Sequence, residues 1–353
     1  MNNRISKYEI LYNKLKYMTT DQLIEIFNNG KISDGVGKNS VTKINNIDVF
    51  IKKIPCTTLE YNNLLNTSNL YNLPCYYNYG VGSVGINCFR ELSTHIKTTR
   101  WVLDNKIKNF PIMYHYRIIK INNSTKNKEI IDKIDKMKIY WNNNENIKKY
   151  LIDREEASYE IMIILEYFPN VLYKWLEEKI ENIYLYEKQI YPILNFLYDN
   201  NIIHFDTHDA NILISNDNTL ILTDFGLVLD LSFDLTYEEI KFFNKNTYYD
   251  YGLALSTINN PLLWMSMYSQ NKIHQKWFDD KYNFKLGNSI SNRKIIYKNL
   301  NEIFNYLKLN NKYKNIVKKY KNIELIFHIF IKTMRNNDNK DTIFPNNKIK
   351  KLC

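Results

Sequence analysis

The pattern of hydrophobic and polar positions begins its regular part with two β-type runs. Residues 40–44 and 47–54 are rich in branched apolar side chains and are separated only by Asn45-Asn46. Asparagine tolerates the positive φ angles that a two-residue hairpin turn requires. The sequence therefore predicts a β-hairpin in this region.

Further along, the pattern changes from strands to helices. Residues 86–103 have helical periodicity, with Ile96 among the apolar positions expected on the inner face. Residues 112–121 and 159–168 predict two more strands, and long helical patterns dominate after Pro169. These elements predict an α+β fold with a small antiparallel sheet followed by a mainly helical part.

The same pattern divides the chain into regions. A helical lead-in is expected at 1–29, a strand-rich lobe at 30–168 and a helical lobe at 169–353. The strand-rich lobe carries two expected insertions, an irregular one at 55–85 and one rich in Asn, Lys and Glu at 122–156.

The charge balance adds little to this picture. The chain has 48 Lys and Arg against 37 Asp and Glu, a formal net charge of +11, which favours polyanionic partners. Lys, Asn, Ile and Tyr are abundant throughout, however, and no nucleic-acid reading module is visible. We therefore do not expect nucleic acid as a partner.

The cysteines and the apolar runs indicate an intracellular protein. Cys56, Cys75, Cys88 and Cys353 have neither C-x-x-C spacing nor His partners at metal-ligand spacing, so reduced thiols are expected. No run of 18 apolar residues could span a membrane. A cytoplasmic location without membrane partners follows as an expectation.

The strongest chemical signal lies at residues 204–226. His204-Phe205-Asp206 is followed by Asn211, five residues after Asp206, and by Asp224-Phe225-Gly226, whose Asp lies eighteen residues after Asp206. Phosphoryl transfer needs a carboxylate near the attacking hydroxyl and oxygen ligands for Mg²⁺ at the phosphates. These residues supply both.

This segment resembles the catalytic loop and the D-F-G motif of the protein-kinase superfamily. The resemblance implies a bilobal kinase-like fold, with ATP and Mg²⁺ or Mn²⁺ as cofactors in the cleft between the lobes. It makes Asp206 the catalytic base and Asn211 and Asp224 the metal ligands. Residues 69–112 also look like part of a little-characterised group of microbial and viral serine/threonine-protein-kinase-like proteins. If the protein is viral, this resemblance implies that it acts inside a host cell.

The resemblance implies two further catalytic residues upstream. Val49-Phe50-Ile51-Lys52 resembles the V-A-I-K strand, which assigns Lys52 to the ATP phosphates. Glu91, on the predicted helix 86–103, is the candidate partner of Lys52, although it lies 39 residues further on. A solvated helix carboxylate is the alternative for Glu91.

Two glycine-containing segments compete for the phosphate-covering role. Gly35-x-Gly37-x-x-Ser40 precedes the Lys52 strand and resembles a glycine-rich phosphate cover with Ser at the third position. The second segment, residues 80–85, is a literal G-x-G-x-x-G, but it follows Lys52 and lacks a βαβ unit around it. We expect it to be a flexible lead into the helix 86–103.

The end of the strand 159–168 resembles the kinase hinge. Leu165 falls at the gatekeeper position, and backbone groups of Glu166 and Phe168 are implied to hydrogen-bond adenine. Main-chain groups make these contacts, so side-chain identity carries little information here.

Departures from the protein-kinase pattern leave the acceptor open. Phe205 replaces the arginine that responds to a phosphorylated activation segment. His208 is similar to the histidine of aminoglycoside phosphotransferases and either acts near the acceptor or is a buried structural residue. Asp250 begins a helix 26 residues after Asp224, which leaves a short activation segment.

Three functions are compared on these observations, and nucleotidyl transfer on the same fold stays open beside them. A serine/threonine protein kinase with a protein acceptor is favoured, and a small-molecule kinase is the alternative. A non-catalytic pseudokinase scaffold is disfavoured because every implied catalytic residue is present.

Overall fold

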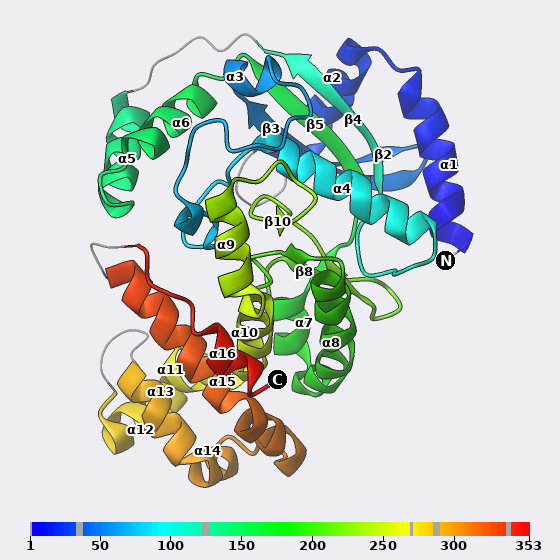
Figure 1. Ribbon diagram of the computed structural model, residues 1–353. Coiled ribbons are helices and arrows are strands. Elements are labelled where there is room, and N and C mark those ends of the chain that lie inside the picture. The colour runs from blue at the N-terminus through cyan, green and yellow to red at the C-terminus, as the bar shows by residue number, and fades with distance from the viewer. Residues whose placement is uncertain (1, 33–37, 122–127, 269–270, 285–289, 337–339) are drawn as a thin grey trace. The chain divides into compact units, whose positions relative to one another are not determined.

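The computed structural model shows a chain of two compact units (Figure 1). The first unit comprises Met1–Pro169 and Ser215–Phe242, and the second comprises Asn170–Ile214 and Phe243–Cys353. The structure describes residues 2–32, 38–121, 128–268, 271–284, 290–336 and 340–353.

The first unit is built on one five-stranded sheet. Its strand order is β1-β2-β3-β5-β4, and every neighbouring pair is antiparallel. The strands are β1 (Lys31–Ile32), β2 (Lys38–Ile44), β3 (Ile47–Cys56), β4 (Met113–Lys120) and β5 (Tyr159–Glu166).

The predicted hairpin joins β2 to β3. Asn45 and Asn46 have φ angles of 50° and 61°, the left-handed values that a tight two-residue turn demands. Val49 and Ile51 of β3 are fully buried on one face of the sheet. The alternation of β3 thereby turns Lys52 to the opposite face.

Helices of the first unit pack around this sheet. They are α1 (Asn2–Lys16), α2 (Thr20–Asn28), α3 (Thr58–Tyr61), α4 (Cys88–Leu103), α5 (Lys128–Tyr140) and α6 (Glu145–Glu155), and α9 (Tyr237–Asn246) spans the boundary at Phe242. The short strands β9 (Leu220–Leu222) and β10 (Leu229–Asp230) and the 3₁₀ turn Cys75–Asn78 complete the described elements.

Helix α4 covers the sheet and corrects one expectation. Phe89 and Leu92 are fully buried in a core shared with β3 and β5. Ile96, predicted on the inner face, is 42% exposed. The polar residues Thr94 and Thr98 are buried instead, so the buried face lies further round the helix than its apolar pattern indicates.

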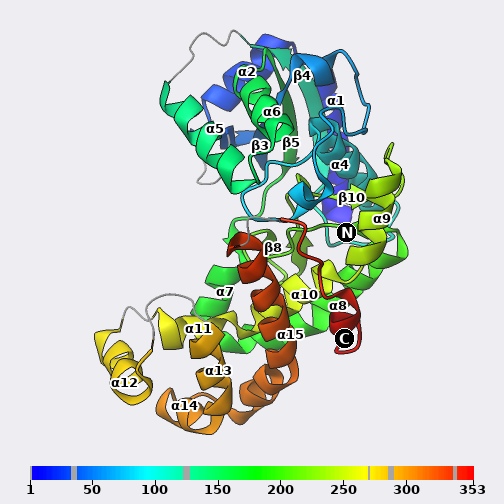
Figure 2. The ribbon, with the colours of Figure 1, turned by 60° about the vertical axis from the view of Figure 1, so that its left-hand side comes forward.

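The two expected insertions form a core of their own. The segment 55–85 contributes Tyr71, Leu73 and Tyr77, which pack with Trp141 and residues of α6. Figure 2 shows α5 and α6 next to each other. Both segments therefore belong to one packed layer of the first unit.

The second unit is mainly helical. Strand β6 (Asn170–Val171) pairs antiparallel with β8 (Ile212–Ile214), and β7 (Ile202–Ile203) precedes the catalytic-loop segment. The helices are α7 (Leu172–Glu178), α8 (Ile183–Asp199), α10 (Tyr249–Ser256), α11 (Asn260–Met267), α12 (Lys272–Tyr282), α13 (Ile290–Lys298), α14 (Leu300–Tyr306), α15 (Asn311–Asn336) and α16 (Asn346–Lys350).

A close helix crossing holds this unit together. Helix α10 packs on α15, and a Cβ on Gly252 would lie 2.8 Å from the Phe327 ring. Glycine is therefore required where the two helices meet. The predicted α+β class, an antiparallel sheet and a mainly helical remainder, is confirmed.

Membrane insertion was not expected from the sequence. Among the helices that the structure describes, none has both the length and the apolar character that crossing a bilayer requires.

Candidate active site

Lys52 lies between two carboxylates of the first unit. Its Nζ donates to Glu91 Oε1 at 2.6 Å and to Asp224 Oδ1 at 2.9 Å. Burial lowers the pKa of Lys52, but the charges of Asp224 and Glu91 more than offset this, so the pKa lies above its ordinary value. The side chain is therefore a fixed ammonium at neutral pH.

Local structure brings Glu91 to Lys52. The side chain of Asn87 caps α4 by accepting from Phe89 N, which places Glu91 in the first turn of the helix. Glu91 is only 5% exposed, so it is not the solvated helix carboxylate of the alternative interpretation. Burial raises the pKa of Glu91, whereas the nearby ammonium of Lys52 lowers it.

Asp224 has a strained backbone conformation. Its φ is +66°, a backbone angle that residues other than glycine seldom adopt outside functional sites. The next residue, Phe225, is fully buried and packs edge-on against His95 with ring centroids 4.7 Å apart. This anchoring turns the carboxylate of Asp224, 44% exposed, towards Lys52.

The G-x-G-x-x-G loop lies against the D-F-G motif. Gly85 has φ +86°, and a Cβ there would come within 2.2 Å of the carbonyl oxygen of Gly226. Gly82 has φ +87°, but a Cβ there would meet only Met137 Cε, at 3.5 Å. The loop thus supports Asp224-Phe225-Gly226 through a backbone contact that only glycine permits.

The catalytic-loop residues lie together in the second unit. Asn211 Nδ2 donates to Asp206 Oδ2 at 2.8 Å and to the Asp206 carbonyl at 3.1 Å. These bonds orient the Asn211 amide, whose other atom, Oδ1, is the oxygen that the predicted metal role requires.

His208 lies beside Asp206 at the surface of this unit. Its side chain is 38% exposed, and Nε2 is 3.5 Å from Asp206 Oδ1. Nδ1 accepts from the backbone N–H of Ala210 at 3.1 Å, so the proton of the neutral ring is on Nε2, facing Asp206. The alternative of a buried structural histidine is wrong, because more than a third of the side chain is exposed.

Asp250 anchors the catalytic loop, a role that the sequence reasoning did not assign to it. Its carboxylate accepts from the backbone N–H groups of His204 and Phe205, at 2.6 and 2.9 Å. Burial raises the pKa of Asp250 to about 7, although the two hydrogen bonds lower it. Phe205, at φ +61°, is fully buried against Tyr249, with ring centroids 4.9 Å apart.

The predicted hinge strand is held by the N-terminal helix. The guanidinium of Arg4 donates to both carboxylate oxygens of Glu166, at 2.6 to 3.0 Å, and to the carbonyl oxygens of Lys108 and Phe110. It also lies 5.8 Å from the ring centre of Phe168. This fork was missed because Arg4 and Glu166 are 162 residues apart and share no local pattern.

The groups of Glu166 differ in their availability. Its backbone N–H donates to the Ile112 carbonyl at 2.8 Å, so the sheet already uses this donor. An adenine contact at this residue would therefore use the Glu166 carbonyl.

The predicted phosphate cover is described only at its end. Gly35 and Gly37 lie outside the described residues. Ser40 is buried in β2, and its hydroxyl donates to the Phe27 carbonyl at 3.0 Å. The side chain of Ser40 therefore attaches the strand to α2.

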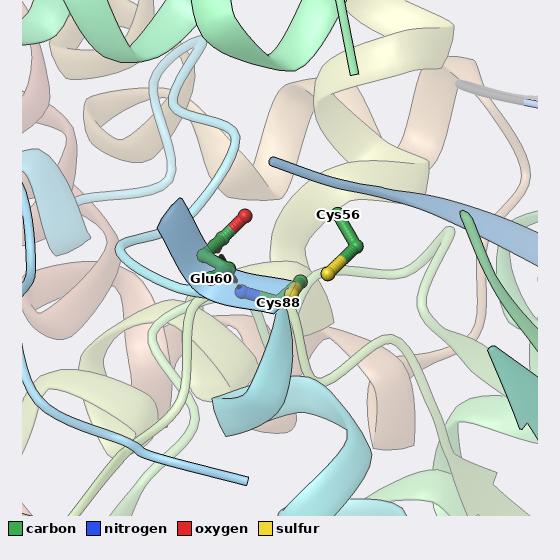
Figure 3. A group of neighbouring side chains, drawn as sticks. All are labelled: Cys56, Glu60 and Cys88. Carbon is green, nitrogen blue, oxygen red and sulfur yellow. Dashed lines mark hydrogen bonds between the residues drawn. The ribbon is translucent and has the colours of Figure 1, made fainter. Parts of the chain in front are cut away.

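Cys56, Glu60 and Cys88 form a buried cluster whose potential ligand atoms lie within 4.8 Å of one another (Figure 3). Both Glu60 oxygens accept backbone N–H groups, from Thr57 and Cys88, each at 2.8 Å. Burial raises the pKa of the Cys88 thiol well above its usual range. The cluster thus caps the starts of α3 and α4.

Two groups of predicted site residues therefore come together, each within one unit. Lys52, Glu91 and Asp224 meet in the first unit, and Asp206 and Asn211 meet in the second.

The protein kinase domain family matches residues 112–246. A probable serine/threonine-protein kinase, mkcD of Dictyostelium discoideum, is 28% identical over 113 residues. That alignment covers 30% of this chain and 17% of mkcD, so the chain matches only a small part of that relative's length.

The sheet, helix α4 and the Lys52–Glu91–Asp224 arrangement define a kinase-like fold. The matched family and the relative support membership of the protein-kinase superfamily.

Proposed function

We propose that this protein is an ATP-dependent phosphotransferase that moves the γ-phosphate to a hydroxyl group, as a serine/threonine-type protein kinase. The observation that carries the proposal is the fixed ammonium of Lys52, held 2.6 Å from Glu91 and 2.9 Å from Asp224. An ordinary surface lysine would have neither the burial nor the two carboxylates.

Lys52 and Glu91 prepare the nucleotide site. The ammonium of Lys52 binds the α- and β-phosphates of ATP, and Glu91 holds it in that position. Both are rigid because β3 and α4 pack in one core. The sheet thus positions charge before the nucleotide arrives, which lowers the reorganisation needed during transfer.

Asp206 acts on the acceptor. Its carboxylate takes the proton of the attacking hydroxyl as the new oxygen–phosphorus bond forms and the bond to the β-phosphate oxygen breaks, which releases ADP. Asn211 keeps Asp206 in place through its Nδ2 bond. The proton on His208 Nε2 faces the same carboxylate, with Nε2 3.5 Å from Asp206 Oδ1.

The metal and adenine contacts follow from donor chemistry and the family resemblance. Carboxylate and amide oxygens suit Mg²⁺ or Mn²⁺, which fits Asp224 and Asn211 as ligands. Bound metal would neutralise phosphate charge. The Glu166 carbonyl and the Phe168 backbone are assigned to adenine, and Gly35, Gly37 and Ser40 to the phosphate cover.

A small-molecule kinase is the second candidate, and the exposed position of His208 next to Asp206 favours it. The two functions differ only in the acceptor. Incubation with γ-labelled ATP and either protein or small hydroxyl acceptors separates them, since the label appears in protein or in the small-molecule fraction. An intracellular location remains part of the proposal.

Nucleotide binding is tested by thermal stability with and without Mg-ATP. A ligand that binds only the folded state raises the melting temperature. At a ligand concentration of a hundred times Kd, the folded state is stabilised by about 2.7 kcal/mol. Asp224→Asn should reduce this increase, because it removes a negative ligand for the metal. No increase in the wild-type protein, with the variant behaving identically, would contradict nucleotide binding.

A further inference from the structure

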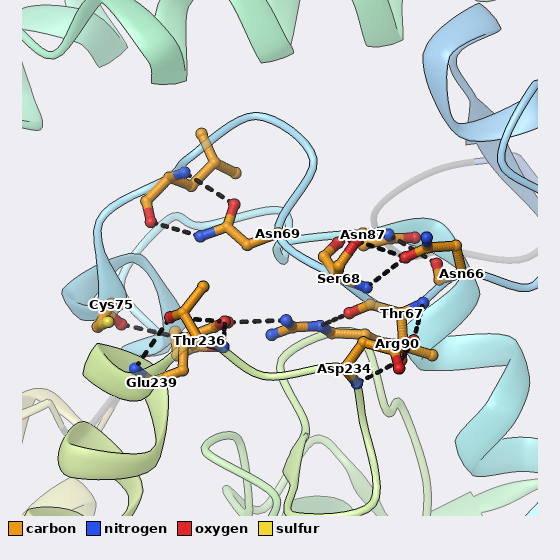
Figure 4. A network of polar contacts seen from close by, with 12 residues as sticks. Asn66, Thr67, Ser68, Asn69, Cys75, Asn87, Arg90, Asp234, Thr236 and Glu239 are labelled. Carbon is orange, nitrogen blue, oxygen red and sulfur yellow. Dashed lines mark hydrogen bonds and ion pairs between the residues drawn. The ribbon is translucent and has the colours of Figure 1, made fainter.

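Arg90 precedes Glu91 in α4 and is almost completely buried. It is 1% exposed, and its guanidinium donates to the carbonyl of Thr67 at 2.8 Å and to Glu239 Oε1 at 2.7 Å (Figure 4). The guanidinium also lies 5.5 Å from the Phe233 ring centre. Arg90 thus links the catalytic helix to a segment that follows the D-F-G motif.

Glu239 is equally buried and equally fixed. It is 1% exposed, and its second oxygen accepts from the backbone N–H and the hydroxyl of Thr236, at 3.0 and 3.1 Å. The Thr236 hydroxyl accepts in turn from Glu239 N, which completes a capping box at the start of α9. One oxygen of Glu239 therefore fixes α9, and the other holds Arg90.

Thr67 and Asp234 add a second connection between the same parts. The backbone N–H and hydroxyl of Thr67 donate to Asp234 Oδ2, and Asp234 N donates to the Thr67 hydroxyl at 2.9 Å. Because Thr67 also accepts from Arg90, the two connections form one network (Figure 4). Further along α4, Lys97 pairs with Asp230.

Both charges of the Arg90–Glu239 pair are out of water, so neither can leave its partner without becoming a buried unpaired charge. The start of α4 can therefore move away from the segment 230–239 only with difficulty. A helix moves as a unit, and the residue after Arg90 is Glu91. The network fixes the part of α4 that presents Glu91 to Lys52.

We propose that the buried Arg90–Glu239 ion pair is a built-in substitute for phosphorylation of the activation segment. In protein kinases, activation-segment phosphorylation and helix positioning control whether the Lys–Glu pair forms. Here Phe205 stands where the phosphate-responsive arginine is expected, and a carboxylate of the segment itself reaches α4. Arg90 and Glu239 are positioning residues that keep Glu91 on Lys52 without modification. This inference rests on the proposed function.

The test compares Glu239→Gln with Glu238→Gln in the full chain. Glutamine at 239 keeps an oxygen for the Thr236 cap but removes the charge that pairs with Arg90. Glu238 is the matched control, since it lies one residue away in α9, is exposed, and pairs at the surface with Lys241 at 3.7 Å. The two variants have the same change in net charge.

Two readouts are measured, and the first does not depend on catalysis. Hydrogen exchange of the α4 backbone amides should become faster in Glu239→Gln and stay at the wild-type rate in Glu238→Gln. Phosphoryl transfer by Glu239→Gln should fall about tenfold or more, within the usual range of couplings between sites. Phosphatase-treated wild-type protein should keep its activity.

Three results would overturn the inference. The first is unchanged α4 exchange in Glu239→Gln, and the second is an equal response in Glu238→Gln. The third is loss of wild-type activity on dephosphorylation. Should Glu239→Gln fail to fold, Arg90→Lys, which keeps the charge but loses the two-bond fork, is measured in the same way. A wild-type protein that transfers no phosphate contradicts the proposed function, whereas the exchange experiment still decides the inference.

Discussion

Replacing Lys52 by Met measures how strongly the active-site charges depend on each other. Methionine keeps an unbranched apolar side chain but removes the ammonium that lies 2.6 Å from Glu91 Oε1. The buried carboxylate of Glu91, 5% exposed, then loses the positive charge to which it was hydrogen-bonded. We expect Lys52→Met to lower the free energy of unfolding at pH 7.

The magnitude follows from the protonation of Glu91. Since each pKa unit corresponds to about 1.36 kcal/mol and the ordinary pKa of Glu is about 4.3, protonating it at pH 7 costs about 3.7 kcal/mol. This cost is an upper limit for the contribution of Glu91 to the loss of stability, because the carboxyl group can take up a proton instead of staying charged. Asp224 is 44% exposed, so its lost contact adds about 1 kcal/mol or less. The expected total is about 2–4 kcal/mol.

The loss should depend on pH. In the variant, the folded-state pKa of Glu91 lies further above its unfolded value, so the native state binds more protons and is less stable as the pH rises. Lowering the pH from 7 to 5 should recover up to about 2.7 kcal/mol of the loss. Adding Glu91→Gln to the Lys52→Met variant should abolish this pH dependence.

The assay is urea unfolding followed by tryptophan fluorescence at pH 5, 6 and 7, for the wild type, both single variants and the double variant. A loss that is the same at all three pH values, or no loss, would refute the reasoning that Glu91 is buried against the Lys52 ammonium.

Three further predictions concern the supports of the site. Gly82→Ala should cost about 1–2 kcal/mol for its left-handed backbone alone, whereas Gly85→Ala should cost clearly more in thermal unfolding, because its Cβ meets a backbone oxygen at 2.2 Å. Equal costs would contradict the close contact. Because the folded-state pKa of Asp250 is about 7, the stability advantage of the wild type over Asp250→Asn should shrink as the pH rises from about 4 to 7. A growing advantage would show that Asp250 is ionised throughout. Arg4→Lys should lower the melting temperature nearly as much as Arg4→Ala, since an ammonium cannot reproduce the bidentate contact with Glu166; full rescue by lysine would exclude that role for the fork.

The active-site motifs could be predicted because their chemistry is tied to short spacings. Asp206 and Asn211 are five residues apart, and the β-hairpin and strand alternation fix the side of the sheet on which Lys52 lies. Glu91 could be inferred only as a candidate, because it lies 39 positions after Lys52 and an irregular segment comes between them. The assigned roles of these residues, and the predicted domain boundaries, stay predictions.

The supports of the site could not be predicted from the sequence. The contacts Arg4–Glu166 and Arg90–Glu239 join residues 162 and 149 positions apart. No helical or strand period relates such residues, and buried charges break the hydrophobic pattern on which the prediction depends. Ile96 shows the same limit, since buried polar residues on α4 displace it to the surface.

The most direct test of the central claim measures ATP affinity and transfer from γ-labelled ATP side by side for the wild type, Asp206→Ala, His208→Ala and Asp224→Ala. The account predicts that the wild type labels a hydroxyl acceptor. Asp206→Ala should lower the rate of phosphoryl transfer about a hundredfold or more, with ATP affinity nearly unchanged. Asp224→Ala should lose both ATP binding and transfer. His208→Ala should lose less transfer than Asp206→Ala. Near wild-type transfer by Asp206→Ala, or a wild type that binds Mg-ATP but labels no hydroxyl acceptor, would contradict it.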